Sequence, residues 1–166
     1  AFHMDGGGWQ QEGTLATRGL AADDAFGASV SMDGDQAMVS APGRNEAEGA
    51  VFAFRFDPGS GEWSPSGQLL PFDGFQRDGF GSTIALGAGE VWVGSPLAAG
   101  RQGAAYVLSG GISEGWGAAT KLTNSDPRAG DGFASALDVE GDVAVVGVMG
   151  ADYGVGTATI FERDDE

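Results

Sequence analysis

The sequence predicts an all-β protein made of three repeated units, and two recurring signals carry that prediction. A motif of the form Asp-x-Phe-Gly/Ala occurs at residues 24–27, 78–81 and 131–134, so its phenylalanines lie 54 and 53 residues apart. Tryptophan returns at the same two steps, at Trp9, Trp63 and Trp116. No stretch of about 11 residues shows the 3.6-residue hydrophobic period of an amphipathic helix. Markers that return in one order at one step indicate a repeat architecture.

Each unit contains short runs with strand character, separated by turn residues. The first run follows the phenylalanine, and a Gly-Asp or Gly-Glu pair forms the hairpin turn after it, where positive φ is needed. The second run is continuously apolar, which indicates burial on both faces. The third run begins at a glycine and the fourth at a tryptophan. The expected strands are 29–32, 37–40, 49–54 and 63–70 in the first unit, 83–86, 91–94, 103–108 and 116–122 in the second, and 136–139, 143–146 and 156–161 in the third.

Four-stranded antiparallel repeats of this length are typical of β-propeller blades. One blade is apolar on both faces and cannot bury them alone, so neighbouring blades must stack on it. We expect Phe26, Phe80 and Phe133 to pack between blades, and Gly27 and Gly81 to let the inner strands approach closely. The chain then divides into residues 1–8 as a linker or cloning remnant, 9–62 as repeat 1, 63–115 as repeat 2 and 116–166 as repeat 3.

The chain does not begin with the first strand of a blade or end with the last one. The chain begins with an expected strand of the fourth type, at residues 9–15, and ends with one of the third type, at residues 157–161, so the last blade lacks its own outer strand. Three blades are also fewer than the about four to eight of closed propellers. We expect the N-terminal strand of one copy to complete the last blade of another, giving six blades in a homodimer, which is favoured, or nine in a trimer. The alternative is a fragment of a longer ring. The strand-exchange interface would comprise Trp9, Leu15, Thr157, Thr159 and Phe161.

The repeat also resembles a known family. Asp-x-Phe-Gly-x-Ser-Val-Ser, then Gly-Asp, Val-Ser-Ala-Pro and Gly-Ala-Val-Phe-Ala-Phe, resembles the FG-GAP repeat most closely in residues 24–56, and less closely in 78–108 and 131–161. The third copy departs where Ala134 replaces glycine and Val148-Met149 replaces the Ala-Pro pair. The resemblance implies a propeller like those of integrin α-subunit heads and bacterial extracellular proteins. It therefore implies an extracellular or cell-surface location and a part in cell adhesion or recognition.

The resemblance raises the question of whether this chain binds calcium. Some FG-GAP blades bind Ca²⁺ through an inserted Asp-rich loop between the first two strands. Here that loop is only residues 32–36 or 87–90. A Ca²⁺ ion takes about six to eight oxygen ligands, usually spread over about a dozen loop residues. We expect a plain hairpin there, and no metal or other cofactor.

The composition narrows the classes of function. The chain carries 24 acidic and 8 basic residues, for a net charge of -16, which argues against nucleic acid and anionic membranes as partners. It has no cysteine and a single histidine, His3, which excludes a thiolate site, a cluster of imidazole ligands and a Ser-His-Asp triad within this sequence. No apolar run is long enough to span a membrane, and the N-terminus does not show the pattern of a signal peptide.

The sequence therefore predicts a non-catalytic binding or scaffold module without catalytic residues. Its candidate contact surfaces are the loops 43–48, 57–62, 97–102 and 150–155, where Tyr153 is the one aromatic residue. The ligand stays open. Three alternatives remain at this point: a piece of a larger adhesion propeller, a propeller hydrolase or lyase, and a glycan-binding, lectin-like module.

Overall fold

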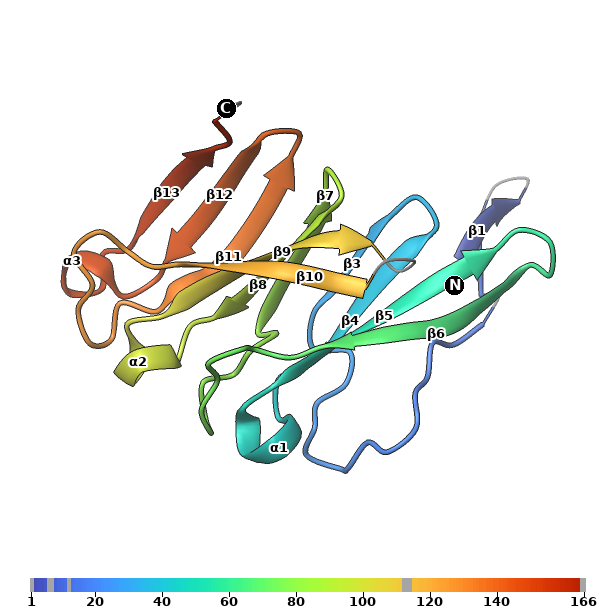
Figure 1. Cartoon of the computed structure of the whole chain (residues 1–166), viewed down its shortest axis with the longest axis horizontal. Helices are drawn as coiled ribbons and strands as arrows, with labels where there is room; N and C mark the ends of the chain where they lie inside the picture. The colour runs from blue at the N-terminus through green and yellow to red at the C-terminus, as the bar shows by residue number, and fades with distance from the viewer. Residues whose placement is uncertain (1, 6–7, 12, 112–114, 165–166) are drawn as a thin grey trace.

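The computed structural model describes residues 2–5, 8–11, 13–111 and 115–164. Three antiparallel sheets of four, four and three strands lie side by side along the long axis of the molecule (Figure 1). We call them blades 1, 2 and 3. Blade 1 contains β3 (Val30–Asp33), β4 (Gln36–Ala41), β5 (Ala50–Asp57) and β6 (Glu62–Leu69); blade 2 contains β7 (Thr83–Gly87), β8 (Glu90–Ser95), β9 (Ala104–Gly111) and β10 (Gly115–Leu122); blade 3 contains β11 (Phe133–Glu140), β12 (Val143–Val148) and β13 (Thr157–Glu162). The predicted all-β blade architecture is confirmed.

The N-terminal segment differs from the prediction. A strand was expected from Trp9 to Leu15, but β2 (Gly8–Gln11) ends four residues earlier. It pairs with β1 (Phe2–Asp5), with Met4 opposite Trp9, so part of the expected linker forms the first strand of a hairpin. Residues 1, 6 and 7 of that linker lie outside the described residues, as do residues 112–114 of repeat 2 and 165–166 of repeat 3.

Polar side chains join the inner strands of neighbouring blades. The hydroxyl oxygens of Ser29 and Ser31 accept hydrogen bonds from the N–H groups of Ile84 and Leu86, each at 3.0 Å. At the next boundary, the Thr83 hydroxyl donates to the carbonyl of Ala134, also at 3.0 Å. Small side chains at these positions let the strands come close, and their hydroxyls partner backbone groups of the neighbouring blade.

A second set of bonds joins each blade to the linker that leads into the next, and we call this contact the blade junction. The segment between the second and third strands of each blade forms a single turn, α1 (Arg44–Ala47), α2 (Ala98–Arg101) or α3 (Ala151–Gly154), where the sequence predicted loops. Carbonyl groups of the last residue of α1 and α2, and of the residue after it, accept hydrogen bonds from the Asp-x-Phe motif of the next blade. These bonds run from Gly79 to Ala47 at 2.8 Å, Phe80 to Glu48 at 3.0 Å, Gly132 to Arg101 at 2.9 Å and Phe133 to Gln102 at 2.9 Å.

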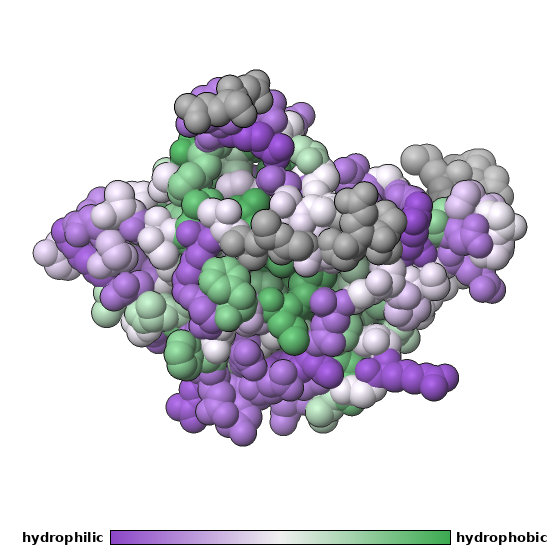
Figure 2. All heavy atoms as spheres, in the orientation of Figure 1, coloured by the Kyte–Doolittle hydropathy of each residue, from purple (hydrophilic) through white to green (hydrophobic). Residues whose placement is uncertain are grey.

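Two apolar cores fill the spaces between blades. Met38, Val51 and Ala53 of blade 1 pack against Phe80 and Tyr106 of blade 2. A matching core joins Trp92 and Ala105 of blade 2 to Phe133, Val146 and other residues of blade 3. Phe80 and Phe133 are completely buried, whereas Phe26, which has no blade before it, is only half-buried. Space-filling atoms show hydrophobic residues gathered near the middle of one face, with hydrophilic residues around them (Figure 2).

The third repeat has alanine where the other two have glycine after the phenylalanine, but its backbone has a positive φ at this position as they do. Gly27 and Gly81, which follow the phenylalanines of blades 1 and 2, have φ of 95° and 91°. Ala134 stands at this position in blade 3 and has φ of 64°. A residue with a Cβ is disfavoured there by about 1–2 kcal/mol, so the surrounding blade imposes this conformation on Ala134.

None of the helices in the described part of the chain has the length and apolar character needed to cross a bilayer.

The blade junction leads to a first prediction. Gly103 forms a parallel β-bridge with Phe133 at φ of 89°, and a Cβ at Gly103 would collide with the backbone of Phe133. Gly89 has φ of 75° in the hairpin between β7 and β8, with open space around it. We expect Gly89→Ala to lower the free energy of unfolding by about 1–2 kcal/mol through its φ alone. Gly103→Ala should lower it by about 1–3 kcal/mol more because of the collision. Urea denaturation of both variants measures the difference, and equal losses would contradict the close approach at the junction.

Candidate interaction surfaces

The two end blades each present one face that no other blade covers. The outer face of blade 3 carries Val143, Val145 and Ile160, all exposed. On the outer face of blade 1, β3 exposes Val30 and Met32, while the remaining apolar residues are covered by the segment that enters the blade. Leu15, Leu20 and Phe26 of that segment pack there against a cluster that includes Phe52 and Phe54.

Equivalent positions in the other blades show what these faces lack. Val145 is 41% exposed, whereas Met38, its equivalent in blade 1, is fully buried against blade 2. Val30 is 66% exposed, whereas Ile84, its equivalent in blade 2, is 7% exposed because blade 1 covers it. Both outer faces therefore carry apolar residues at positions that are buried wherever a neighbouring blade is present, which is the pattern of an unpartnered interface.

At the two ends of the chain, backbone groups at the blade-junction positions also lack the partners that they have between blades. Val155 occupies the position of Glu48 and Gln102, and Phe26 occupies that of Phe80 and Phe133. Among the described residues, neither the carbonyl of Val155 nor the N–H of Phe26 makes a backbone hydrogen bond. An acceptor without a backbone partner among the described residues therefore lies on blade 3, and the matching donor lies on blade 1.

The residues predicted for strand exchange lie at two opposite ends of the chain. Trp9 is exposed on β2, and Leu15 is half-buried on the outer face of blade 1. Thr157, Thr159 and Phe161 lie on β13, whose second edge pairs with no strand in the described part of the chain. Phe161 packs inward, with its ring centroid 6.2 Å from that of Trp92 and 6.1 Å from that of Phe133. Figure 1 shows β1 and β13 at the two ends of the long axis, so one chain does not bring the two sets together.

The four predicted contact loops separate into two groups. Loops 43–48, 97–102 and 150–155 join second to third strands and hold α1, α2 and α3 at one end of the blades (Figure 1). The loop 57–62 joins β5 to β6 and therefore lies at the opposite end, where Asp57 accepts hydrogen bonds from Gly59 and Ser60. These four loops therefore do not form one contact surface.

Two exposed aromatic residues were missed by sequence reasoning. Phe72 and Phe75 lie in the linker from β6 to β7, and Phe75 is 75% exposed. The linker is bonded to the α1 segment, since Arg77 donates its N–H to the carbonyl of Glu46 at 3.1 Å. The predicted contact loops follow the second and third strands of a blade, whereas this linker follows the fourth strand and was therefore not among them.

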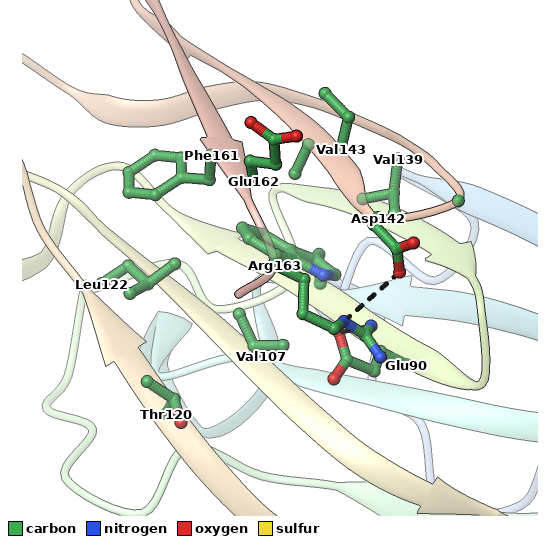
Figure 3. Close-up of a pocket in the computed structure, with 13 residues that line it drawn as sticks. Glu90, Val107, Thr120, Leu122, Val139, Asp142, Val143, Phe161, Glu162 and Arg163 are labelled. Carbon is green, nitrogen blue, oxygen red and sulfur yellow. Dashed lines mark ion pairs between the residues drawn. The ribbon is translucent and has the colours of Figure 1, made fainter. Parts of the chain in front are cut away.

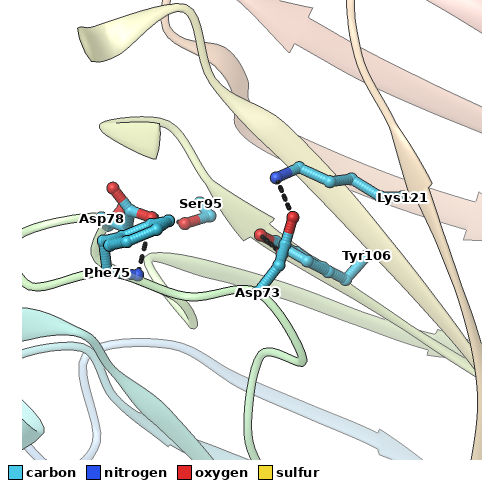
Figure 4. A network of polar contacts seen from close by, with 6 residues as sticks. All are labelled: Asp73, Phe75, Asp78, Ser95, Tyr106 and Lys121. Atoms are coloured by element: carbon cyan, nitrogen blue, oxygen red, sulfur yellow. Dashed lines mark hydrogen bonds and ion pairs between the residues drawn. The ribbon is translucent and has the colours of Figure 1, made fainter. Parts of the chain in front are cut away.

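Blade 2 also contains a polar cluster that the repeated sequence motifs did not predict. Asp73 of the linker accepts hydrogen bonds from the Tyr106 hydroxyl at 2.8 Å and from the Lys121 ammonium at 2.7 Å (Figure 4). Burial and the neighbouring Asp73 carboxylate raise the pKa of Tyr106 above its ordinary value, so its hydroxyl stays protonated and serves as a donor. Burial acts to raise the pKa of Asp73, but the bonds from Lys121 and Tyr106 outweigh it and hold that pKa below 3.8.

The recurring aspartates of the Asp-x-Phe motif close turns. Asp24, Asp78 and Asp131 each accept a hydrogen bond from the backbone N–H three residues earlier, at 2.9, 3.1 and 2.9 Å. Asp35 in the first hairpin turn pairs with Arg55 at 3.0 Å. Within the described ranges, no group of three or more histidine, cysteine, aspartate or glutamate side chains is arranged to hold a metal ion.

The polar cluster leads to a second prediction. Asp73→Asn should lower the free energy of unfolding at pH 7 by about 1 kcal/mol, because the cluster loses its charged acceptor. The folded state lowers the pKa of Asp73, so its contribution is present above pH 3.8 and is lost as the pH falls toward the lower folded value. The variant should therefore lose less stability than the parent protein on acidification. Asp126→Asn is the control, since Asp126 pairs with Arg128 at an exposed site where an ion pair contributes little. Equal acid sensitivity of the parent and Asp73→Asn in urea denaturation would contradict this role.

Comparison with known proteins agrees with this geometry. The FG-GAP repeat family matches residues 9–54 and 116–161. The first range runs from the entering segment through β3, β4 and most of β5 of blade 1, and the second covers nearly all of β10 of blade 2 and of the three strands of blade 3. No match was found among curated proteins. The blades, the Asp-x-Phe turns and the match over more than half of its residues show that this chain belongs to the FG-GAP repeat family.

Proposed function

We propose that the chain is a non-catalytic, extracellular scaffold module that closes a propeller ring by association with a second copy of itself. The observation that carries this proposal is the complementarity of the two end blades. Blade 3 ends in the face that blades 1 and 2 turn toward a following blade, and blade 1 begins with the face that blades 2 and 3 turn toward a preceding one. Two copies would supply six blades, within the about four to eight of closed propellers.

Polar groups support the same docking. Asp138 pairs with Val145 in blade 3 as Ser31 pairs with Met38 in blade 1. Ser31 accepts a hydrogen bond from the blade that follows it, so Asp138 stands where a carboxylate would accept the Met32 N–H of a second copy. The carbonyl of Val155 and the N–H of Phe26 would meet at the same junction. Docking would thus repeat between chains the contacts that blades make within the chain.

Charge opposes this association. Each copy carries a net charge of -16, and like charges on two copies repel. Salt screens interactions between exposed charges, with a Debye length of about 8 Å at physiological ionic strength. The buried apolar contacts at the junction do not depend on that screening. Association should therefore strengthen when the salt concentration rises.

The third prediction tests self-association. The parent protein should give one discrete species of twice the 16.8 kDa chain mass by light scattering, more stable at higher salt. Ile160→Asp places a charge at the centre of the outer face of blade 3, which should leave the fold intact and make the protein monomeric. Gln76→Asp is the control, because it adds the same charge at an exposed site in a linker. A parent protein that stays monomeric at every concentration contradicts the proposal.

A recognition role at the end formed by α1 and the β6–β7 linker is a second candidate. Exposed Phe72 and Phe75 favour it, since exposed aromatic residues on loops held by a rigid scaffold are common contact sites. Phe72 is anchored, with its ring centroid 5.6 Å from that of the buried Tyr106. Aromatic platforms of this kind suit the apolar face of a sugar.

The fourth prediction concerns this surface. If a glycan array yields a ligand, Phe75→Ala should weaken its binding at least about tenfold, the loss typical of an exposed aromatic contact of about 1–2 kcal/mol. Tyr153→Ala is the comparison, since Tyr153 lies in α3 of blade 3 and is fully exposed. Unchanged binding in Phe75→Ala, or an equal loss in both variants, would contradict recognition through the linker.

A further inference from the structure

The fourth-strand tryptophan closes the outer end of a blade in both four-stranded blades. In blade 1, Trp63 packs beside the outer-face cluster, with its ring centroid 5.4 Å from that of Phe56. In blade 2, Trp116 packs against the core between blades 1 and 2. In each case the tryptophan lies on the face that the blade turns toward the preceding one. It fills the space beyond the apolar residues of the second and third strands.

Blade 3 has no fourth strand in the described part of the chain, and a cavity lies on the corresponding face. It has a volume of about 230 Å³ and opens between blades 2 and 3. Its walls include Val107 and Leu122 from blade 2 and Val139, Phe161 and Arg163 from blade 3 (Figure 3). Trp92 also lines it, and the buried indole N–H of Trp92 has no hydrogen-bond partner among the residues that the structure describes.

Size and chemistry both favour a single aromatic side chain as the occupant. An apolar cavity of about 150 Å³ holds a benzene ring, whereas small-molecule sites usually enclose about 300–1,000 Å³. A volume between these limits suits an indole. The guanidinium of Arg163 is held at the cavity by Glu90 at 2.8 Å and by Asp142 at 3.8 Å. A cation in that position attracts the face of an aromatic ring, and tryptophan most strongly.

Strand register identifies the position from which the side chain would enter. Trp63 lies opposite Phe56 on β5, and Trp116 lies opposite Gly110 on β9. Arg163 follows β13 at the equivalent position, one 53-residue step beyond Gly110. A tryptophan on a fourth strand beside β13 would thus lie opposite a residue that lines the cavity.

Trp9 is the tryptophan that remains without a blade. It is 71% exposed on β2, and β2 pairs only with β1 within the described ranges, so one edge of β2 remains free for another strand. The equivalent registers place Thr14 opposite Thr159, as Gln68 lies opposite Phe52 in blade 1. Because the N-terminal hairpin and β13 lie at opposite ends of one chain (Figure 1), the partner must be another molecule.

We propose that the cavity between blades 2 and 3 is a socket for Trp9 of a second copy. In the complex, β2 of that copy and the residues that follow it as far as Thr14 add antiparallel to β13 as the fourth strand of blade 3, with Trp9 opposite Arg163 and Thr14 opposite Thr159. This inference rests on the proposed self-association and adds the side chain and the site that anchor it. The socket replaces exposed indole surface with apolar contact and completes the blade.

The first experiment compares dimer dissociation constants by analytical ultracentrifugation. Trp9→Ala should weaken the dimer at least about 30-fold, as expected for an anchor residue at the centre of an interface, and Trp9→Phe should weaken it less. Phe75→Ala is the matched control, because Phe75 is an equally exposed aromatic residue away from the socket, and it should leave the constant unchanged. If Trp9→Ala dimerises like the parent while Ile160→Asp does not, self-association stands and the socket is wrong. If the parent never dimerises, both proposals are overturned.

The second experiment tests the register directly. The chain has no cysteine, so Thr14→Cys and Thr159→Cys can be prepared as two single variants and mixed under oxidising conditions. The mixture should form a disulfide-linked pair that contains one copy of each variant. Each variant alone should form far less crosslinked product. Crosslinking in the mixture no greater than in the separate variants would overturn the strand pairing, whatever the oligomeric state.

Discussion

The structure depends on one constraint: a four-stranded blade has two apolar faces and can bury neither by itself. Within the chain, blade 2 meets this constraint completely, because blades 1 and 3 cover it on either side. Blades 1 and 3 meet it on one face only. The entering segment with Leu15, Leu20 and Phe26 covers part of the outer face of blade 1, whereas the outer face of blade 3 has no cover among the described residues.

Backbone geometry makes this stacking specific. Carbonyl groups at the ends of α1 and α2 receive the N–H groups of the next Asp-x-Phe motif, and glycine at 49 and 103 allows the two backbones to touch. The aspartate of the motif holds its own turn through a side-chain bond, so the phenylalanine enters the core in the same way each time. Apolar burial supplies the stabilisation, and these bonds determine how the blades are aligned.

Much of this architecture could be predicted from the sequence, because strand alternation and the repeated motifs are local signals. Strands in all three blades fall within about three residues of their predicted ends. The features that escaped depend on contacts between units. The Asp73–Tyr106–Lys121 cluster joins a linker to two strands of blade 2, and its counterparts in blade 1 are Gly19, Phe52 and Gln68, so the repeat gives no sign of it. The N-terminal hairpin pairs the Trp9 strand with residues 2–5, which resemble no part of the repeat, and the cavity is lined by residues of two neighbouring blades together.

The junction has a direction, since carbonyls always come from the earlier blade and N–H groups from the later one. A chain therefore has two different ends, and the backbone bonds of the junction cannot form between two copies of the same end. A molecule with one end damaged would still offer the other. In the proposed two-copy ring, such a molecule would join an intact copy through its undamaged end and the ring would stay open, so damaged chains would hold intact ones in incomplete assemblies.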